Sequence, residues 1–119
     1  MTIIANVIVL LVALLHAWIL VLEMFLWDKP AGLRAFGQSL ERAKATKVLA
    51  ANQGLYNGFL SAGLLWGLYQ GAAGYEFKVF FLLCVVVAGI YGAITVSRKI
   101  LFVQALPGLT GLLLVVMSQ

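Results

Sequence analysis

Four long apolar stretches, each about the length of a membrane-spanning helix, make up most of the chain. A spanning helix needs about 20 predominantly apolar residues. The stretches cover about residues 3–27, 48–70, 77–97 and 100–117. Pro30 and Gly32 are helix breakers that end the first stretch, and a basic segment at about 28–47 follows. The pattern predicts an all-α integral membrane protein, with residues 1–119 forming one up-down-up-down four-helix bundle.

The composition excludes an ordinary soluble domain. Hydrophobic residues make up 64% and charged residues 10% of the 119 positions, against about 45–50% and about 25% in soluble domains. The single cysteine, Cys84, excludes an internal disulfide and has no second thiol beside it to bind a metal. The motifs of serine hydrolases and zinc proteases are absent, so no catalytic residue, metal or cofactor can be assigned.

The net charge of +4 is distributed in a way that predicts orientation. Lys and Arg are concentrated in the segment after the first stretch and between the last two, whereas Lys78 is alone on the other side. By the positive-inside rule, both basic connections are cytoplasmic and both termini lie outside, in an inner or plasma membrane. Such charges fit an anionic leaflet, so a nucleic-acid partner is not expected.

The basic segment itself has a helical pattern. Leu33, Phe36 and Leu40 recur at helical spacing, with Arg34 and Arg42 elsewhere on the wheel. This is typical of a short amphipathic helix in the membrane interface. A cytoplasmic extension of the second span is an equally good interpretation.

Polar side chains occur at matching depths in the cytoplasmic half of all four stretches. From a rise of about 1.5 Å per residue, Glu23 lies about 6 Å inside the boundary, and His16 and Asn57 about 15–16 Å inside. Lipid-facing polar groups are costly, so these faces are expected to turn inward and line a polar pocket. The residues expected to line it are His16, Glu23, Asn52, Gln53, Tyr56, Asn57, Tyr91, Thr95 and Gln104.

Each of these signals has a structural alternative. The amides could simply join helices, since interhelical hydrogen bonds of this kind average about 0.6 kcal/mol. Glu23 could be a solvated carboxylate near the interface, and His16 could bond a carbonyl instead of relaying protons.

Small residues in the second stretch form two stripes that predict close helix packing. One stripe could pack within the bundle, and the other could serve a homodimer. The glycines concerned are Gly54, Gly58, Gly63, Gly67 and Gly71.

Four blocks, "HAWILVLEMFLW", "NQGLYNG", "GIYGAIT" and "QALPG", together resemble a family of small bacterial and fungal membrane proteins, domain of unknown function 1304. The similarity spans nearly the whole chain, and "NQGLYNG" is its most specific part. The resemblance implies four spans and supplies no mechanism. The positions it directs attention to are His16, Glu23, Asn52, Gln53, Tyr56, Asn57, Tyr91 and Gln104.

We therefore expect a lipid-embedded protein that binds, and could transport, a small polar or amphipathic molecule through this pocket. In that case Glu23 is the charge or proton site, His16 is a relay, and the amides and tyrosines are the lining. A membrane-embedded enzyme acting on a lipid or quinone-like substrate is the first alternative. The second is a structural or partner-binding membrane protein whose polar cluster only locks the helices.

Overall fold

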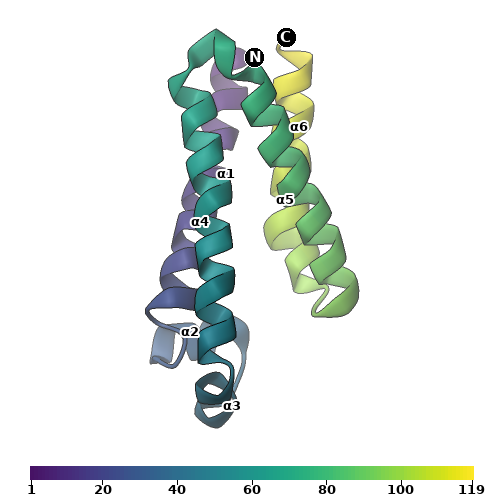
Figure 1. The fold of residues 1–119 in the computed structure, drawn as a ribbon. Coiled ribbons are helices and arrows are strands. Elements are labelled where there is room, and N and C mark those ends of the chain that lie inside the picture. The colour runs from purple at the N-terminus through teal and green to yellow at the C-terminus, as the bar shows by residue number, and fades with distance from the viewer. The chain divides into compact units, whose positions relative to one another are not determined.

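The computed structural model describes all residues from Met1 to Gln119, and every regular element in it is helical (Figure 1). The predicted all-α class is therefore confirmed. The elements in chain order are α1 (Thr2–Met24), α2 (Pro30–Phe36), α3 (Leu40–Ala45), α4 (Lys47–Tyr69), the 3₁₀ helix η1 (Gly71–Gly74), α5 (Tyr75–Thr95), the π-helix η2 (Leu101–Ala105) and α6 (Leu106–Met117).

The segment between α1 and α4 folds as two short helices. Pro30 occupies the first position of α2, where a missing N–H costs nothing, and Gly37 ends that helix with φ of 60°. Ser39 caps α3 by accepting a hydrogen bond from the backbone N–H of Arg42. A single amphipathic helix through Leu40 is not present, because Gly37 and the new cap at Ser39 interrupt it. A continuous extension of α4 is not present either, because Thr46 (φ of −111°, ψ of 11°) separates α3 from α4.

By their backbone contacts the residues group into two compact units, one of Met1–Leu14 with Leu60–Gln119 and the other of Leu15–Phe59. The first unit has a core to which four helices contribute. The core side chains are fully or almost fully buried, which places the apolar stripe of each helix on its inner side. They are Ala5, Val9, Val12 and Ala13 of α1, Leu64 of α4, Leu82 and Val85 of α5, and Val115 of α6.

α5 and α6 pack closely against each other because small residues line their contact (Figure 1). A Cβ at Gly89 would lie 2.6 Å from the backbone nitrogen of Ala105. The π-turn at this contact precedes Pro107, whose ring cannot donate a hydrogen bond and clashes with the carbonyl four residues earlier in an α-helix. Widening the turn relieves that clash, and the N–H of Leu106 bonds the carbonyl of Leu101 instead.

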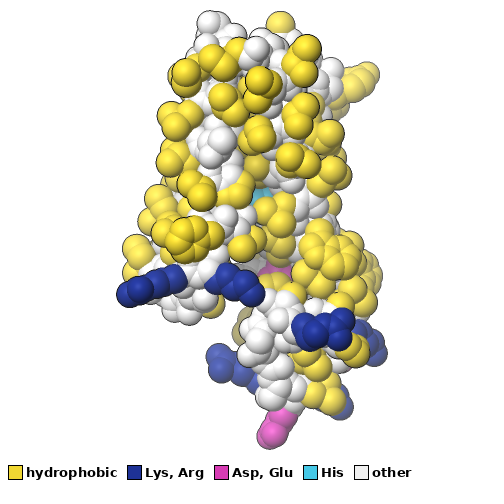
Figure 2. Space-filling view, turned by 180° about the vertical axis from the view of Figure 1, so that it is seen from behind, with side chains coloured by type: hydrophobic (Ala, Val, Ile, Leu, Met, Phe, Trp, Pro, Cys, Tyr) yellow, Lys and Arg dark blue, Asp and Glu magenta, His cyan; other side chains and the backbone are white.

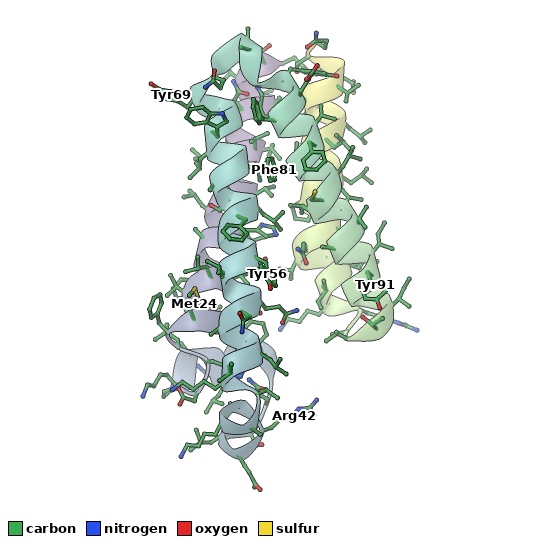
Figure 3. All side chains as sticks on the ribbon, in the orientation of Figure 1. Met24, Arg42, Tyr56, Tyr69, Phe81 and Tyr91 are labelled. Atoms are coloured by element: carbon green, nitrogen blue, oxygen red, sulfur yellow. The ribbon has the colours of Figure 1, made fainter.

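The predicted glycine stripes of α4 contact other segments of this chain. In the second unit, a Cβ at Gly58 would lie 2.6 Å from Leu20. In the first unit, a Cβ at Gly63 would overlap the ring of Phe81, which Figure 3 shows on α5. Gly71 behaves differently: it follows the end of α4, has φ of +62° and has no neighbour within 4 Å of a Cβ position. Its role is therefore to turn the chain, not to pack helices.

Two helical segments are long and apolar enough to cross a membrane, Thr2–Met24 and Gly71–Thr95. The apolar helix Leu101–Met117 is shorter, and α4 is long enough but carries three amides in its first half. Hydrophobic side chains cover most of the face seen in Figure 2. Such a surface is typical of a protein that contacts lipid or another apolar partner.

Candidate functional site

The clearest polar contact between two helices joins Glu23 of α1 to Asn57 of α4. The amide nitrogen of Asn57 donates to Oε1 of Glu23 at 2.6 Å and to the backbone carbonyl of Gln53 at 3.2 Å. Glu23 is only 6% exposed. The interpretation of Glu23 as a solvated carboxylate is therefore wrong, because α4 covers it.

The local sequence explains how the two helices come this close. Gly54 lies one turn before Asn57, and a Cβ there would be 3.1 Å from Cβ of Glu23 and 2.6 Å from Cγ of Met24. Glycine at this position lets α4 approach α1 closely enough for the short Asn57 side chain to reach the carboxylate. The "NQGLYNG" block thus builds the contact from one small residue, Gly54, and one polar residue, Asn57.

Glu23 has no cationic partner within the chain. The protein contains one ion pair, and it joins Lys47 to Asp28. A buried carboxylate that accepts a bond from an amide alone is incompletely compensated, because ionised groups lose much of their solvation on burial. This arrangement can accept a proton or the positively charged group of a ligand.

His16 lies on the same inward side of α1, two turns before Glu23. The side chain is completely buried and has an interaction partner within the protein. Seven residues of helix separate the two positions by about 10 Å along the axis. A direct proton transfer between them would therefore need an intervening group.

The other α4 residues predicted for the pocket are exposed. Asn52 donates to the carbonyl of Val48 in its own helix at 3.0 Å. Tyr56 is 58% exposed and has its ring 6.2 Å from that of Phe59. Only the backbone of Gln53 takes part in the Glu23 contact.

The remaining predicted residues belong to the other unit. Tyr91 is 69% exposed and stands outward from α5 (Figure 3), where it borders a shallow apolar groove along that helix. The hydroxyl of Thr95 donates to the carbonyl of Tyr91 at 2.7 Å. Gln104 is half-buried in the π-turn and has an interaction partner. These residues do not contribute to the Glu23–Asn57 contact.

Two further polar clusters were not predicted. Where α1 ends, Lys47 pairs with Asp28 at 3.1 Å and the indole of Trp27 donates to Thr46 at 3.1 Å. The hydrogen bond from Lys47 lowers the pKa of Asp28 below its usual value. The opposite charges of Asp28 and Lys47, at the two ends of the basic segment, were the sequence signal for this ion pair.

The second cluster joins Lys78 of α5 to Asn6 of α1. The ammonium donates to Oδ1 of Asn6 at 3.2 Å, and the lysine is only 8% exposed. From the sequence, Lys78 served only to set the orientation of the chain. Its separation from the other basic residues was the signal that it has a distinct role.

Comparisons with known proteins identify relatives but no activity. A family described as "Protein of unknown function (DUF1304)" matches residues 10–116. The "Uncharacterized protein YpaA" of Lactococcus lactis subsp. lactis (strain IL1403) is 32% identical over 106 residues, covering 87% of this chain and 89% of that protein. No solved structure is significantly similar.

Proposed function

The chain belongs to the family of unknown function DUF1304, and we propose that it is a membrane protein that binds a small polar or amphipathic molecule at Glu23. The buried carboxylate, joined to Asn57 and lacking any cation, is the observation that carries this proposal. Ionisable groups inside membrane helices are rare and mark binding sites or ion paths by default. Movement of the bound molecule across the membrane is the natural extension of this role.

The proposed membrane arrangement has four spans, with α4 and the η2–α6 segment crossing beside the two more apolar helices. Both termini lie outside an inner or plasma membrane, and the basic segment at 28–47 is cytoplasmic. The exposed apolar side chains support it, because their contact with lipid removes the cost of leaving them in water. The uneven distribution of Lys and Arg supports the orientation.

Single cysteines test this topology in a Cys84→Ser background. A cysteine at Ala73, in the exposed η1 turn, is expected to react with a membrane-impermeant maleimide in intact cells. A cysteine at Leu40, which is 45% exposed at the start of α3, is expected to react only after permeabilisation. The reverse pattern, or labelling of both in intact cells, would contradict the arrangement.

In the proposed site, the Glu23 carboxylate binds the polar or charged group of the ligand and Asn57 fixes the carboxylate in position. An amide is suited to this task because it donates to the carboxylate without neutralising it, which leaves the charge available to the ligand. His16, buried two turns further along α1, acts as the proton relay of the same path.

Native mass spectrometry of the detergent-released protein tests the binding function. Wild type is expected to retain a non-protein mass that Glu23→Gln and Asn57→Ala lose. The matched control is Asn52→Ala. It removes an identical side chain from the same helix, but one that bonds only the backbone of α4. A bare wild-type chain, or the absence of any mass that Glu23→Gln and Asn57→Ala lose, would leave the contact with a purely structural role.

A further inference from the structure

Lys78 is an unusual lysine because its side chain is buried beside a glycine. It lies in the first turn of α5 and is 8% exposed. A Cβ at Gly67 of α4 would lie 2.8 Å from Cγ of Lys78, so glycine at that position makes room for the lysine stem. The packing therefore holds the side chain in place along α4 and does not leave it free in water.

No carboxylate neutralises this ammonium. The one ion pair of the chain is between Lys47 and Asp28, and the exposed Glu76 near Lys78 forms none. The group that Lys78 does bond is the neutral amide of Asn6, at 3.2 Å. Burying a cation is costly unless an anion compensates it, so the environment of Lys78 favours an anion from outside the chain.

The hydrogen-bonding inventory of the pair defines the chemistry of that anion. An ammonium has three N–H donors and no acceptor, so Asn6 must present its oxygen to Lys78 and turn its own N–H groups away. Lys78 then has two N–H groups left and Asn6 has two, and the protein provides no acceptor for them. All remaining polar hydrogens of the pair are thus donors, which suits a group with several acceptor oxygens.

We infer that Lys78 and Asn6 form a binding site for a phosphate-type oxyanion. Asn6 is half-buried, so part of the pair is accessible from outside the protein. The positive end of the α5 dipole, whose N-cap Gly74 makes no side-chain bond, adds to the same field.

The position along the helices suits the phosphate of a lipid headgroup. Asn6 lies in the second turn of α1 and Lys78 in the first turn of α5. Both are therefore within about 6 Å of the start of their helices along the axis. At the end of a spanning helix this is the interfacial region, where lipid phosphates lie. Free phosphate has the same oxygen chemistry, and the two sources are separated by experiment.

Native mass spectrometry in a neutral detergent provides the test, with the full chain titrated by phosphatidylglycerol, by diacylglycerol of the same acyl composition, or by inorganic phosphate. Wild type is expected to retain at least about fivefold more phosphatidylglycerol than diacylglycerol. Lys78→Met and Asn6→Asp are expected to remove this preference. Lys99→Met, which removes an exposed charge elsewhere, should leave it unchanged.

Asn6→Asp is the most informative variant because it supplies an internal carboxylate for Lys78 and removes both amide donors. It should fold as well as wild type by thermal unfolding yet lose the anion, whereas Lys78→Arg should keep it. Should Lys78→Met fail to fold, these two variants decide the question. Competition by inorganic phosphate would identify a site for free phosphate as well, and its absence would identify a lipid site. Equal retention of diacylglycerol, or an unchanged preference in Asn6→Asp, would overturn the inference.

Discussion

The contact between Glu23 and Asn57 makes a quantitative prediction about coupling between two helices. Asn57→Ala removes the amide that donates to Glu23 at 2.6 Å and leaves a buried carboxylate without this hydrogen bond. Glu23→Gln keeps an oxygen that accepts the same bond and removes the charge. The double variant closes a cycle that isolates the interaction of the amide with the charge.

The expected magnitudes differ between the two backgrounds. Loss of a hydrogen bond to a charged group costs about 2 kcal/mol, so Asn57→Ala should lower the free energy of unfolding by that amount in wild type. In the Glu23→Gln background the same change removes a neutral bond between membrane helices, which is worth about 0.6 kcal/mol. The coupling energy is then about 1.4 kcal/mol, a tenfold difference in the unfolding equilibrium.

Equilibrium unfolding in mixed micelles, followed by far-ultraviolet circular dichroism, measures all four corners of this cycle. Asn52→Ala is the control, because that amide bonds the carbonyl of Val48 in its own helix and is exposed. We expect it to change the free energy of unfolding by less than about 0.5 kcal/mol. A coupling energy within about 0.3 kcal/mol of zero would refute the reasoning, since the bond would then stabilise the charged and neutral forms alike.

Two further predictions concern packing and pH. Gly89→Ala should lower the free energy of unfolding by about 1–3 kcal/mol more than Gly92→Ala. The new methyl group meets the backbone of Ala105 in the first variant and the side chain of Ile100 in the second. Similar thermal midpoints for the two variants would contradict this. Lys47 lowers the pKa of Asp28 in the folded protein. The pair therefore stabilises the fold fully above about pH 3.9, the pKa of aspartate in the unfolded chain. This contribution disappears as the pH falls through the lower pKa of the folded state. The thermal midpoint of Asp28→Asn should therefore change less between pH 6 and 2.5 than that of wild type. Parallel plots of midpoint against pH for the two proteins would show that the pair contributes nothing.

Long apolar stretches predict helices well because each one needs only a uniform environment, and the predicted ends agree with α1, α4 and α5 to within a few residues. Features that depend on specific contacts were less predictable. Pro30 begins a helix as well as following one, and whether Phe36 and Leu40 share a helix was decided by the left-handed residue Gly37 between them. The π-turn before α6 was not predicted either, because Pro107 indicates a disturbed helix without showing which kind of turn relieves the clash.

In the candidate site too, the buried side of a helix was predictable from the sequence, whereas the specific contacts were not. Spacing along α1 was enough to place His16 and Glu23 on the buried side. Depth was a poor guide to the partner, because it placed Glu23 about 6 Å and Asn57 about 15–16 Å inside the boundary, yet these two residues are in contact. Depth also does not determine rotation, so it could not show that Asn52 bonds its own helix. Lys78 was missed for a related reason: charge counting assigns a lysine to water, whereas space beside a glycine can bury its stem.

The π-turn at Leu101–Ala105 has a consequence for how this chain can be aligned and altered. A wider turn holds about one residue more than an α-turn, and each residue of an α-helix advances the face by about 100°. Deleting one residue there would restore a regular α-turn and would leave the segments on either side close to their present relative rotation, because the wider turn absorbs the extra residue. The half-buried Gln104 would then leave its present orientation. A relative one residue shorter in this segment should therefore be aligned with its gap inside the turn, and its equivalent of Gln104 should not be assumed to point the same way.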